Sequence, residues 1–212
     1  MEDNLSFEIF LLVGKAVEEY LDVLIQFRLD YFKEYPYLYS GTSSSERKYL
    51  STYMSHQKGA VAIAKYKDDV VGFLTGAPLL AFSEMAKKIQ LMFHDPNTSL
   101  DDYFYFGDVI VSPQYRSHGL ATRFFSKFDT AIQQWGFKNA CLLTILREEN
   151  HPLKPKLYKV TNSLWNHLGF LKTPVKIKIQ WPTIQVNGEI KDEVNVLELW
   201  SKKLIIKTLP KS

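Results

Sequence analysis

One turn of the chain combines residue types that suit the binding of a phosphate group. Residues 109–122 run from an aliphatic strand pattern, through Pro113, into the apolar pattern of a long helix. The first turn of a helix carries backbone N–H groups without intrahelical partners, and their dipoles add to a partial positive charge. Gly119 lets the backbone approach an anion without a Cβ in between, Ala121 keeps the next turn small, and Arg116 adds a positive charge. The sequence therefore predicts an anion site at this turn.

The pattern differs from two other phosphate-binding loops. No Lys-Ser or Lys-Thr pair follows Gly119, as a nucleoside triphosphate loop requires, and the chain has no G-x-G-x-x-G for a dinucleotide. What remains, R-x-x-G-x-A, is short. Taken alone, it more often marks a glycine that only permits a tight turn, so its meaning depends on the elements around it.

Hydrophobic periodicity predicts those elements. Helical spacing occurs at residues 15–31, 43–54, 81–93, 120–135 and 160–168, and strand-like runs at residues 7–13, 59–66, 70–78, 103–111, 140–146, 175–181 and 194–200. The strand before the turn, the helix after it and the apolar strand 140–146 form a βαβ unit, which must be parallel and right-handed. The sequence thus predicts an α/β fold with a mixed, mostly antiparallel central sheet, one parallel crossover and flanking helices.

The turn and the order of elements together resemble the GNAT superfamily of acyl-CoA N-acyltransferases. The acetyl-CoA-binding motif of that superfamily is Q/R-x-x-G-x-G/A, here Arg116, Gly119 and Ala121. A later helix that ends in Leu168-Gly169-Phe170 is also similar to the family pattern. The resemblance covers nearly the whole chain and implies a single GNAT acetyltransferase domain over residues 1–212, with acetyl-CoA as co-substrate.

The resemblance also implies where acetyl-CoA binds. Its pantetheine arm would pair with the strand residues Val109, Ile110 and Val111, and the N–H of Val109 would stabilise the oxyanion that forms when an amine attacks the thioester. Its pyrophosphate would lie on the backbone amides of the turn, formed by Arg116, Ser117, His118, Gly119, Leu120, Ala121 and Thr122.

Direct attack by an amine requires a base, and a departing thiolate can use an acid. We predict Asp108 as the base because it directly precedes the pantetheine-pairing residues, although it could instead brace a neighbouring loop, and Tyr103 or Tyr105 could face the substrate in its place. The family places a tyrosine acid in the helix before the Gly-Phe pair, where this chain has Trp165. Tyr158 is the candidate substitute, unless the thiolate leaves without an acid.

The acceptor is expected to be a primary amine of a small cationic molecule. The region 31–53 is rich in tyrosine and follows Asp30, and residues 1–108 hold 10 basic and 16 acidic side chains, a net charge of −6. Aromatic faces and negative charge suit a cation. Three alternatives stay open: a protein or peptide N-acetyltransferase, a non-catalytic acyl-CoA-binding or regulatory module with this fold, and a phosphate binder unrelated to CoA.

Composition excludes several other classes. The net charge of +3 over 212 residues is too near balance for a nucleic-acid binder. The single cysteine, Cys141, makes no internal disulfide and is expected to be a buried strand residue, and the five histidines have no metal-ligand spacing. No apolar stretch is long enough to cross a bilayer. We therefore expect a cytoplasmic monomer or homodimer without a metal, a nucleic-acid partner or a membrane association.

Overall fold

The computed structural model describes residues 5–91 and 99–204, which build one seven-stranded sheet. The strands lie in the order β1-β2-β3-β4-β5-β7-β6, and every neighbouring pair is antiparallel except β4 and β5. The predicted mixed sheet with one parallel crossover is therefore confirmed. The strands are β1 (Glu8–Val13), β2 (Ala60–Tyr66), β3 (Asp69–Pro78), β4 (Tyr103–Val111), β5 (Asn139–Ile145), β6 (Leu171–Ile184) and β7 (Ile190–Lys203).

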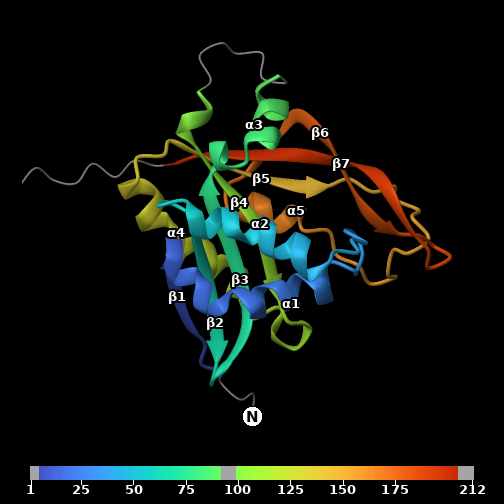
Figure 1. Ribbon diagram of the computed structural model, residues 1–212, viewed down its shortest axis with the longest axis horizontal. Coiled ribbons are helices and arrows are strands. Elements are labelled where there is room, and N and C mark those ends of the chain that lie inside the picture. Colours follow the sequence, from blue (N-terminus) through green and yellow to red (C-terminus); the bar gives the residue numbers. More distant parts are fainter. Residues whose placement is uncertain (1–4, 92–98, 205–212) are drawn as a thin grey trace, which may run out of the picture.

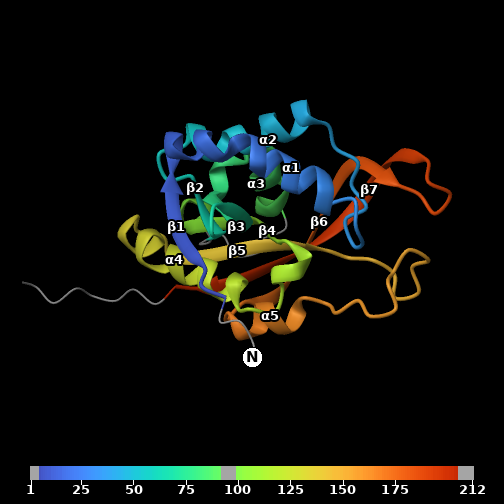
Figure 2. The same cartoon turned by 90° about the horizontal axis from the view of Figure 1, so that it is seen from below.

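Helices cover both faces of this sheet (Figures 1 and 2). On one face lie α1 (Leu21–Tyr31) and α2 (Ser43–Ser55), with α3 (Ser83–Gln90) beside them, and on the other lie α4 (Leu120–Gln134) and α5 (Asn162–His167). On the face covered by α4, here the α4 face, phenylalanines of α4 pack against Phe104 and Phe106 of β4. On the opposite face, α1 and α2 pack against Ile63 and Phe73. Burial of both sheet faces explains why β5 has an almost continuous apolar sequence.

Several predicted bounds differ from those observed. The helical pattern of residues 15–31 is divided into a 3₁₀ helix (Gly14–Tyr20) and α1, and the pattern of residues 81–93 yields only α3, with residues 92–98 outside the described part of the chain. β6 and β7 are twice as long as their predicted apolar cores. They pair from Leu171↔Ser201 to Ile184↔Ile190, so hydrogen bonding within the hairpin continues the strands into polar sequence that periodicity does not detect.

β4 contains a bulge at the point where the sheet divides. Leu74 of β3 lies opposite Val109 and Gly76 lies opposite Phe106, so two residues of β4, Gly107 and Asp108, face the single residue Thr75. Such a bulge reverses the side to which later side chains point. Phe106 therefore belongs to the α4 face, while Asp108, two positions later, meets α1 on the opposite face.

β4 and β5 separate where the bulge begins. Their parallel pairing runs from Tyr103↔Asn139 to Phe106↔Leu142, and β4 continues beyond it to Val111. The split is therefore an opening in the middle of the sheet, with Val109 at its edge. The separation of the two strands provides the space in which a ligand can reach the backbone of β4.

The long β6–β7 hairpin extends past β5 and carries the α1–α2 loop along its edge (Figure 1). Tyr39 forms a bridge with Thr183, Ser40 N–H donates to Pro182 O at 2.9 Å, and Ile184 N–H donates to Leu38 O at 2.7 Å. The loop is thereby fixed to the hairpin over the open end of the β4–β5 split. Among the described residues, no helix is long and apolar enough to span a bilayer.

Candidate functional site

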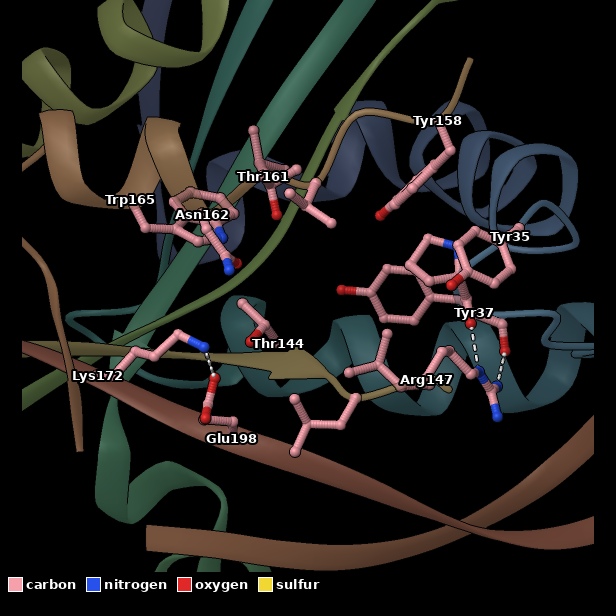
Figure 3. Close-up of a pocket in the computed structure, with 15 residues that line it drawn as sticks. Tyr35, Tyr37, Thr144, Arg147, Tyr158, Thr161, Asn162, Trp165, Lys172 and Glu198 are labelled. Carbon is pink, nitrogen blue, oxygen red and sulfur yellow. Dashed lines mark hydrogen bonds and ion pairs between the residues drawn. The ribbon is translucent and has the colours of Figure 1, made fainter. Parts of the chain in front are cut away.

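Two adjoining cavities lie at the split between β4 and β5. The first, here the Thr144 cavity, has a volume of about 220 Å³ and is shown in Figure 3. The second, the Val111 cavity, has a volume of about 730 Å³ and includes Val109, Ile110, Val111 and Arg116 in its lining. The two cavities share six residues, which mark their junction: Tyr35, Pro36, Tyr37, Val109, Tyr158 and Thr161.

The strand-to-helix turn has the geometry of an anion site. Gly119 is the N-cap residue of α4 with φ +72°, and no side chain caps the helix. A Cβ built on Gly119 would meet nothing within 4 Å, so the space in front of the first helical amides is open. Ser117 also has a positive φ of 67°, and Leu120 anchors the turn in the core. Ser117, His118 and Thr122 are exposed and Ala121 is half-buried.

Arg116 of this turn points back towards β4 and α1. Its Nε donates to Val111 O at 3.0 Å, and its Nη2 lies 3.6 Å from Glu34 Oε2. The side chain is exposed, so this ion pair is weak and can be exchanged for a phosphate. Arg116 thus connects the turn, the end of β4 and the α1–α2 loop.

Asp108 lies in a buried cluster of ionic groups. Its carboxylate is ion-paired with Arg28 of α1, which is also paired with Glu46 of α2, and Thr75 Oγ1 accepts a hydrogen bond from Asp108 N at 2.8 Å. Asp108, Arg28 and Glu46 are 9%, 7% and 0% exposed. Tyr39 Oη donates to the other oxygen of Glu46 at 2.6 Å. Asp108 does not line either of the two cavities.

This ionic cluster holds two carboxylates and one guanidinium, and it therefore carries one excess negative charge. Burial raises the pKa of Asp108, because it disfavours the carboxylate, while the charge of Arg28 opposes that effect. Burial also disfavours the charge of Arg28, but its anionic neighbours outweigh this and raise the pKa of Arg28. The guanidinium lies over the rings of Phe32 and Tyr49, at 4.7 and 4.2 Å from their centroids. Arg28 therefore stays charged in this cluster.

Tyr158 lies at the junction of the cavities, where it lines both. Its ring packs edge-on against Tyr35, with 4.7 Å between centroids, and its side chain extends into the Thr144 cavity (Figure 3). Burial and the nearby Tyr35 raise the pKa of Tyr158, so its hydroxyl keeps its proton at neutral pH. Trp165 also lines the Thr144 cavity, but an indole N–H is not an acid.

An ion pair forms the far side of the Thr144 cavity. Lys172 Nζ lies 2.9 Å from Glu198 Oε2, and Glu198 is 8% exposed. In Figure 3 this pair faces the hydroxyls of Tyr37 and Tyr158 across the cavity, next to Thr144. The cavity therefore has charged groups on one side and aromatic rings on the other.

Sequence patterns pointed to β4, to Asp108 and to the turn before α4, but missed the buried charges of Arg28 and Glu46. The helical spacing contained a signal for them, because Arg28 follows Leu21 and Leu24 by seven and four positions, on the buried face of the helix. Glu46 has the same spacing to Leu50 and Tyr53. No sequence signal identifies Thr144, Lys172 or Glu198, which meet only when β5, β6 and β7 pair.

Two further expectations concern metals and the cysteine. In the described part of the chain, no three His, Cys, Asp or Glu side chains gather as they would around a metal ion. Cys141 is fully buried in β5, as predicted, and burial raises the pKa of its thiol, which makes it a packing residue rather than a nucleophile.

Solved structures with a similar fold include acetyltransferases. The chain is similar to an N-acetyltransferase of Staphylococcus aureus Mu50 (TM-score 0.56, 13% identity, 93% of this chain and 99% of the other). It is equally similar to the ribosomal-protein-S18-alanine N-acetyltransferase of Escherichia coli (TM-score 0.56, 10% identity, 98% and 99%). A Salmonella typhimurium protein solved with its cofactor acetyl-CoA also matches (TM-score 0.53, 10% identity, 97% and 98%).

A family model gives the same result at the level of sequence. No curated protein matches the chain closely enough to count as a relative. The model of the acetyltransferase (GNAT) family, however, matches residues 24–159, a range that runs from within α1 through the α1–α2 loop and the turn before α4 to just past Tyr158. With its mixed sheet, its split between β4 and β5 and its Arg-x-x-Gly-x-Ala turn, this chain belongs to the GNAT family of acetyltransferases.

Proposed function

We propose that the protein transfers the acetyl group of acetyl-CoA to the primary amine of a small cationic molecule. The observation that carries the proposal is the junction of the two cavities, where Val109 and Tyr158 line both. A thioester that reaches this junction from the Val111 cavity meets an amine that enters the Thr144 cavity. Holding the two reactants together at this junction supplies a large part of the catalysis.

Acetyl-CoA binds along β4 and the phosphate turn in this proposal. Val109, Ile110 and Val111 pair with the pantetheine arm, and the amides of residues 116–122 bind the pyrophosphate. The open space in front of Gly119 and the exposed Arg116 support this placement.

The chemical step is a direct attack. The neutral amine nitrogen adds to the thioester carbonyl, and the N–H of Val109 stabilises the oxyanion. The C–S bond breaks, the thiolate takes a proton from the Tyr158 hydroxyl, and the proton that leaves the nitrogen goes to Asp108. The excess negative charge shared by Asp108, Glu46 and Arg28 supports the role of Asp108, because it favours uptake of a proton.

The lining of the Thr144 cavity supports a small cationic amine as the acceptor. Its volume of about 220 Å³ suits a small molecule, and the rings of Tyr35, Tyr37 and Tyr158 offer faces to a cation. The carboxylate of Glu198 at the far side is already paired with Lys172, so the aromatic rings carry the preference for a cation. These features favour a small cationic amine over a protein chain as the acceptor.

The test is acetyl transfer from acetyl-CoA to a panel of primary amines and basic peptides, measured by thiol release and by the mass of the product. We expect transfer to small amines. Transfer to peptides alone would indicate a protein N-acetyltransferase. Tight binding of acetyl-CoA without transfer to any amine would instead indicate a non-catalytic acyl-CoA-binding module, which the Trp165 departure from the family pattern favours as the second candidate.

A further inference from the structure

Arg147 lies just after the end of β5 and connects that strand to the α1–α2 loop. Its Nε donates to Pro36 O at 2.7 Å, and its Nη2 donates to Tyr37 O at 2.9 Å (Figure 3). The planar guanidinium therefore binds two consecutive carbonyl groups of the loop. All three residues line the Thr144 cavity, and Pro36 and Tyr37 also line the Val111 cavity. The contact thus joins two walls of the site.

The part of the loop that lines the cavities depends on this contact. In the part of the chain that the structure describes, no group other than Arg147 forms a hydrogen bond with the backbone of Tyr35, Pro36 or Tyr37. The hydrogen bonds to the β6–β7 hairpin begin one residue later, at Leu38. Packing of the rings adds contacts, but a charge-assisted hydrogen bond is more directional than ring packing. Loss of the guanidinium would therefore release the backbone of these three residues.

The other end of the connection is anchored in the sheet. Leu146 N–H donates to Val196 O at 2.9 Å, so the chain that leads into Arg147 is still fixed to β7. Arg147 is half-buried, and its guanidinium lies beside the backbone of Tyr37, away from the ion pair on the far side of the cavity (Figure 3). Its charge is thus directed at carbonyl oxygens rather than at the centre of the cavity.

The loop carries two of the three rings that offer faces to a cationic acceptor. Tyr35 and Tyr37 come from the loop, whereas Tyr158 comes from the segment between β5 and α5. A cation is attracted to a ring face only within about 6 Å of the ring centroid, so the position of the loop relative to β5 affects the binding of the amine. Rings that are fixed before the amine arrives also lose less conformational freedom when it binds.

We propose that Arg147 is a positioning residue for the amine acceptor. By holding Pro36 O and Tyr37 O at the end of β5, it fixes the rings of the loop around the Thr144 cavity and thereby sets the affinity of the site for the amine. The inference rests on the acetyl transfer proposed above and assigns no chemical step to Arg147. Because Arg147 does not line the Val111 cavity, along which acetyl-CoA is proposed to bind, it leaves acetyl-CoA binding unaffected.

The experiment compares Arg147→Met and Arg147→Lys with the wild type on the best small amine of the panel. Arg147→Met removes both hydrogen bonds, and we expect the KM for the amine to rise about tenfold while kcat changes less than about threefold. Arg147→Lys keeps the charge without the planar fork, so it should recover only part of the loss. The Kd for acetyl-CoA should stay the same. If Arg147→Met does not fold, the KM of Arg147→Lys decides the comparison.

Lys58→Met is the matched control. Lys58 is also half-buried and donates from Nζ to a backbone carbonyl, Trp135 O, at 3.0 Å, but it lines neither cavity. Lys58→Met should lower the free energy of unfolding, measured in urea, and leave the KM for the amine unchanged.

Two results with the Arg147 variants would overturn the proposal. The first is an unchanged KM for the amine with a lower rate, because a residue that only stabilises the fold changes the amount of active enzyme and not its affinity. The second is a lower KM, which would mean that the positive charge of Arg147 repels the amine. If the wild type transfers acetyl to no amine at all, the proposed function itself fails, and the role of Arg147 fails with it.

Discussion

The carboxylate of Asp108 is subject to two opposing influences. Burial favours its protonated form, and the paired Arg28 favours its charged form, with burial the stronger, so that the pKa lies above the ordinary value for aspartate. A base must be deprotonated to act. The rate should therefore rise with pH through the raised pKa of Asp108, and the acid limb of the pH profile should lie above the range of an ordinary aspartate.

Replacing Asp108 by Asn tests this role, because the amide keeps the size of the side chain and loses its basicity. We expect kcat to fall about 10²- to 10⁴-fold, the acid limb to disappear, and the Kd for acetyl-CoA to change little. Steady-state rates from pH 5 to 9 and calorimetric titration with acetyl-CoA provide the measurements. Unchanged turnover at neutral pH would mean that Asp108 only braces α1 against β4.

Gly119 can be tested against a glycine with the same backbone geometry at the other end of α4. Gly119 and Gly136 have φ values of +72° and +85°, and a Cβ on either would meet nothing within 4 Å. Valine at either site strains the backbone to a similar extent. Gly119→Val alone should also weaken acetyl-CoA binding, about a hundredfold or more, if it removes two or three charge-assisted hydrogen bonds to phosphate.

Binding and unfolding are measured on both purified glycine variants. Gly136→Val should lower the free energy of unfolding and leave the Kd unchanged. A folded Gly119→Val protein that binds acetyl-CoA like the wild type would show that the cofactor site is elsewhere.

At the scale of elements, Arg28 joins α1, α2 and β4 through one buried side chain. Arg28→Met removes the cation and leaves Asp108 and Glu46 buried without a counter-charge, which typically costs about 3–5 kcal/mol. Arg47 joins the same two helices through an exposed ion pair with Asp22, so Arg47→Met should cost about 1 kcal/mol or less. Urea unfolding of the two variants measures both costs. Equal costs would contradict the structural role assigned to the buried cluster.

The elements themselves were largely predictable, because each has a periodic apolar pattern. The strand Tyr103–Val111 has the bounds that the pattern predicts, and the crossover to β5 follows from the order of elements. The bulge was not predictable. Gly107 has room for no Cβ, since the Tyr53 hydroxyl would lie 2.1 Å away, but that contact exists only after α2 has packed on β4.

Dependence on tertiary packing also explains which parts of the site could not be predicted from the sequence. The turn before α4 is local in sequence, so its residue types and spacing can be recognised there. The ionic cluster of Arg28, Glu46 and Asp108 joins residues up to 80 positions apart, and the Thr144 cavity joins the α1–α2 loop to β7. Such contacts depend on tertiary packing, which periodicity does not contain.

For the whole molecule, acetyl-CoA should act as a stabiliser of the fold. A ligand that binds the native state and is present at about 100 times its Kd raises the free energy of unfolding by roughly 2.7 kcal/mol. In a domain of this size, that corresponds to a rise in Tm of several degrees. Thermal unfolding with and without millimolar acetyl-CoA measures the shift. ATP at the same concentration is the control, because stabilisation by ATP alone would indicate an unrelated phosphate binder.

Because β4 and β5 separate, the central sheet of the free protein is incomplete between these two strands. Beyond Phe106↔Leu142, the backbone of β4 is paired with β3 on one side only, so the interior of the sheet contains a short edge strand. Edges of this kind recruit other extended chains, and proteins usually cover them. A pantetheine arm hydrogen-bonded to Val109 and Val111 would complete the ladder, much as a peptide does in β-augmentation. Bound acetyl-CoA would then also cover a strand edge that could otherwise pair with another chain. Amide hydrogen exchange along residues 107–111 should therefore slow when acetyl-CoA is bound.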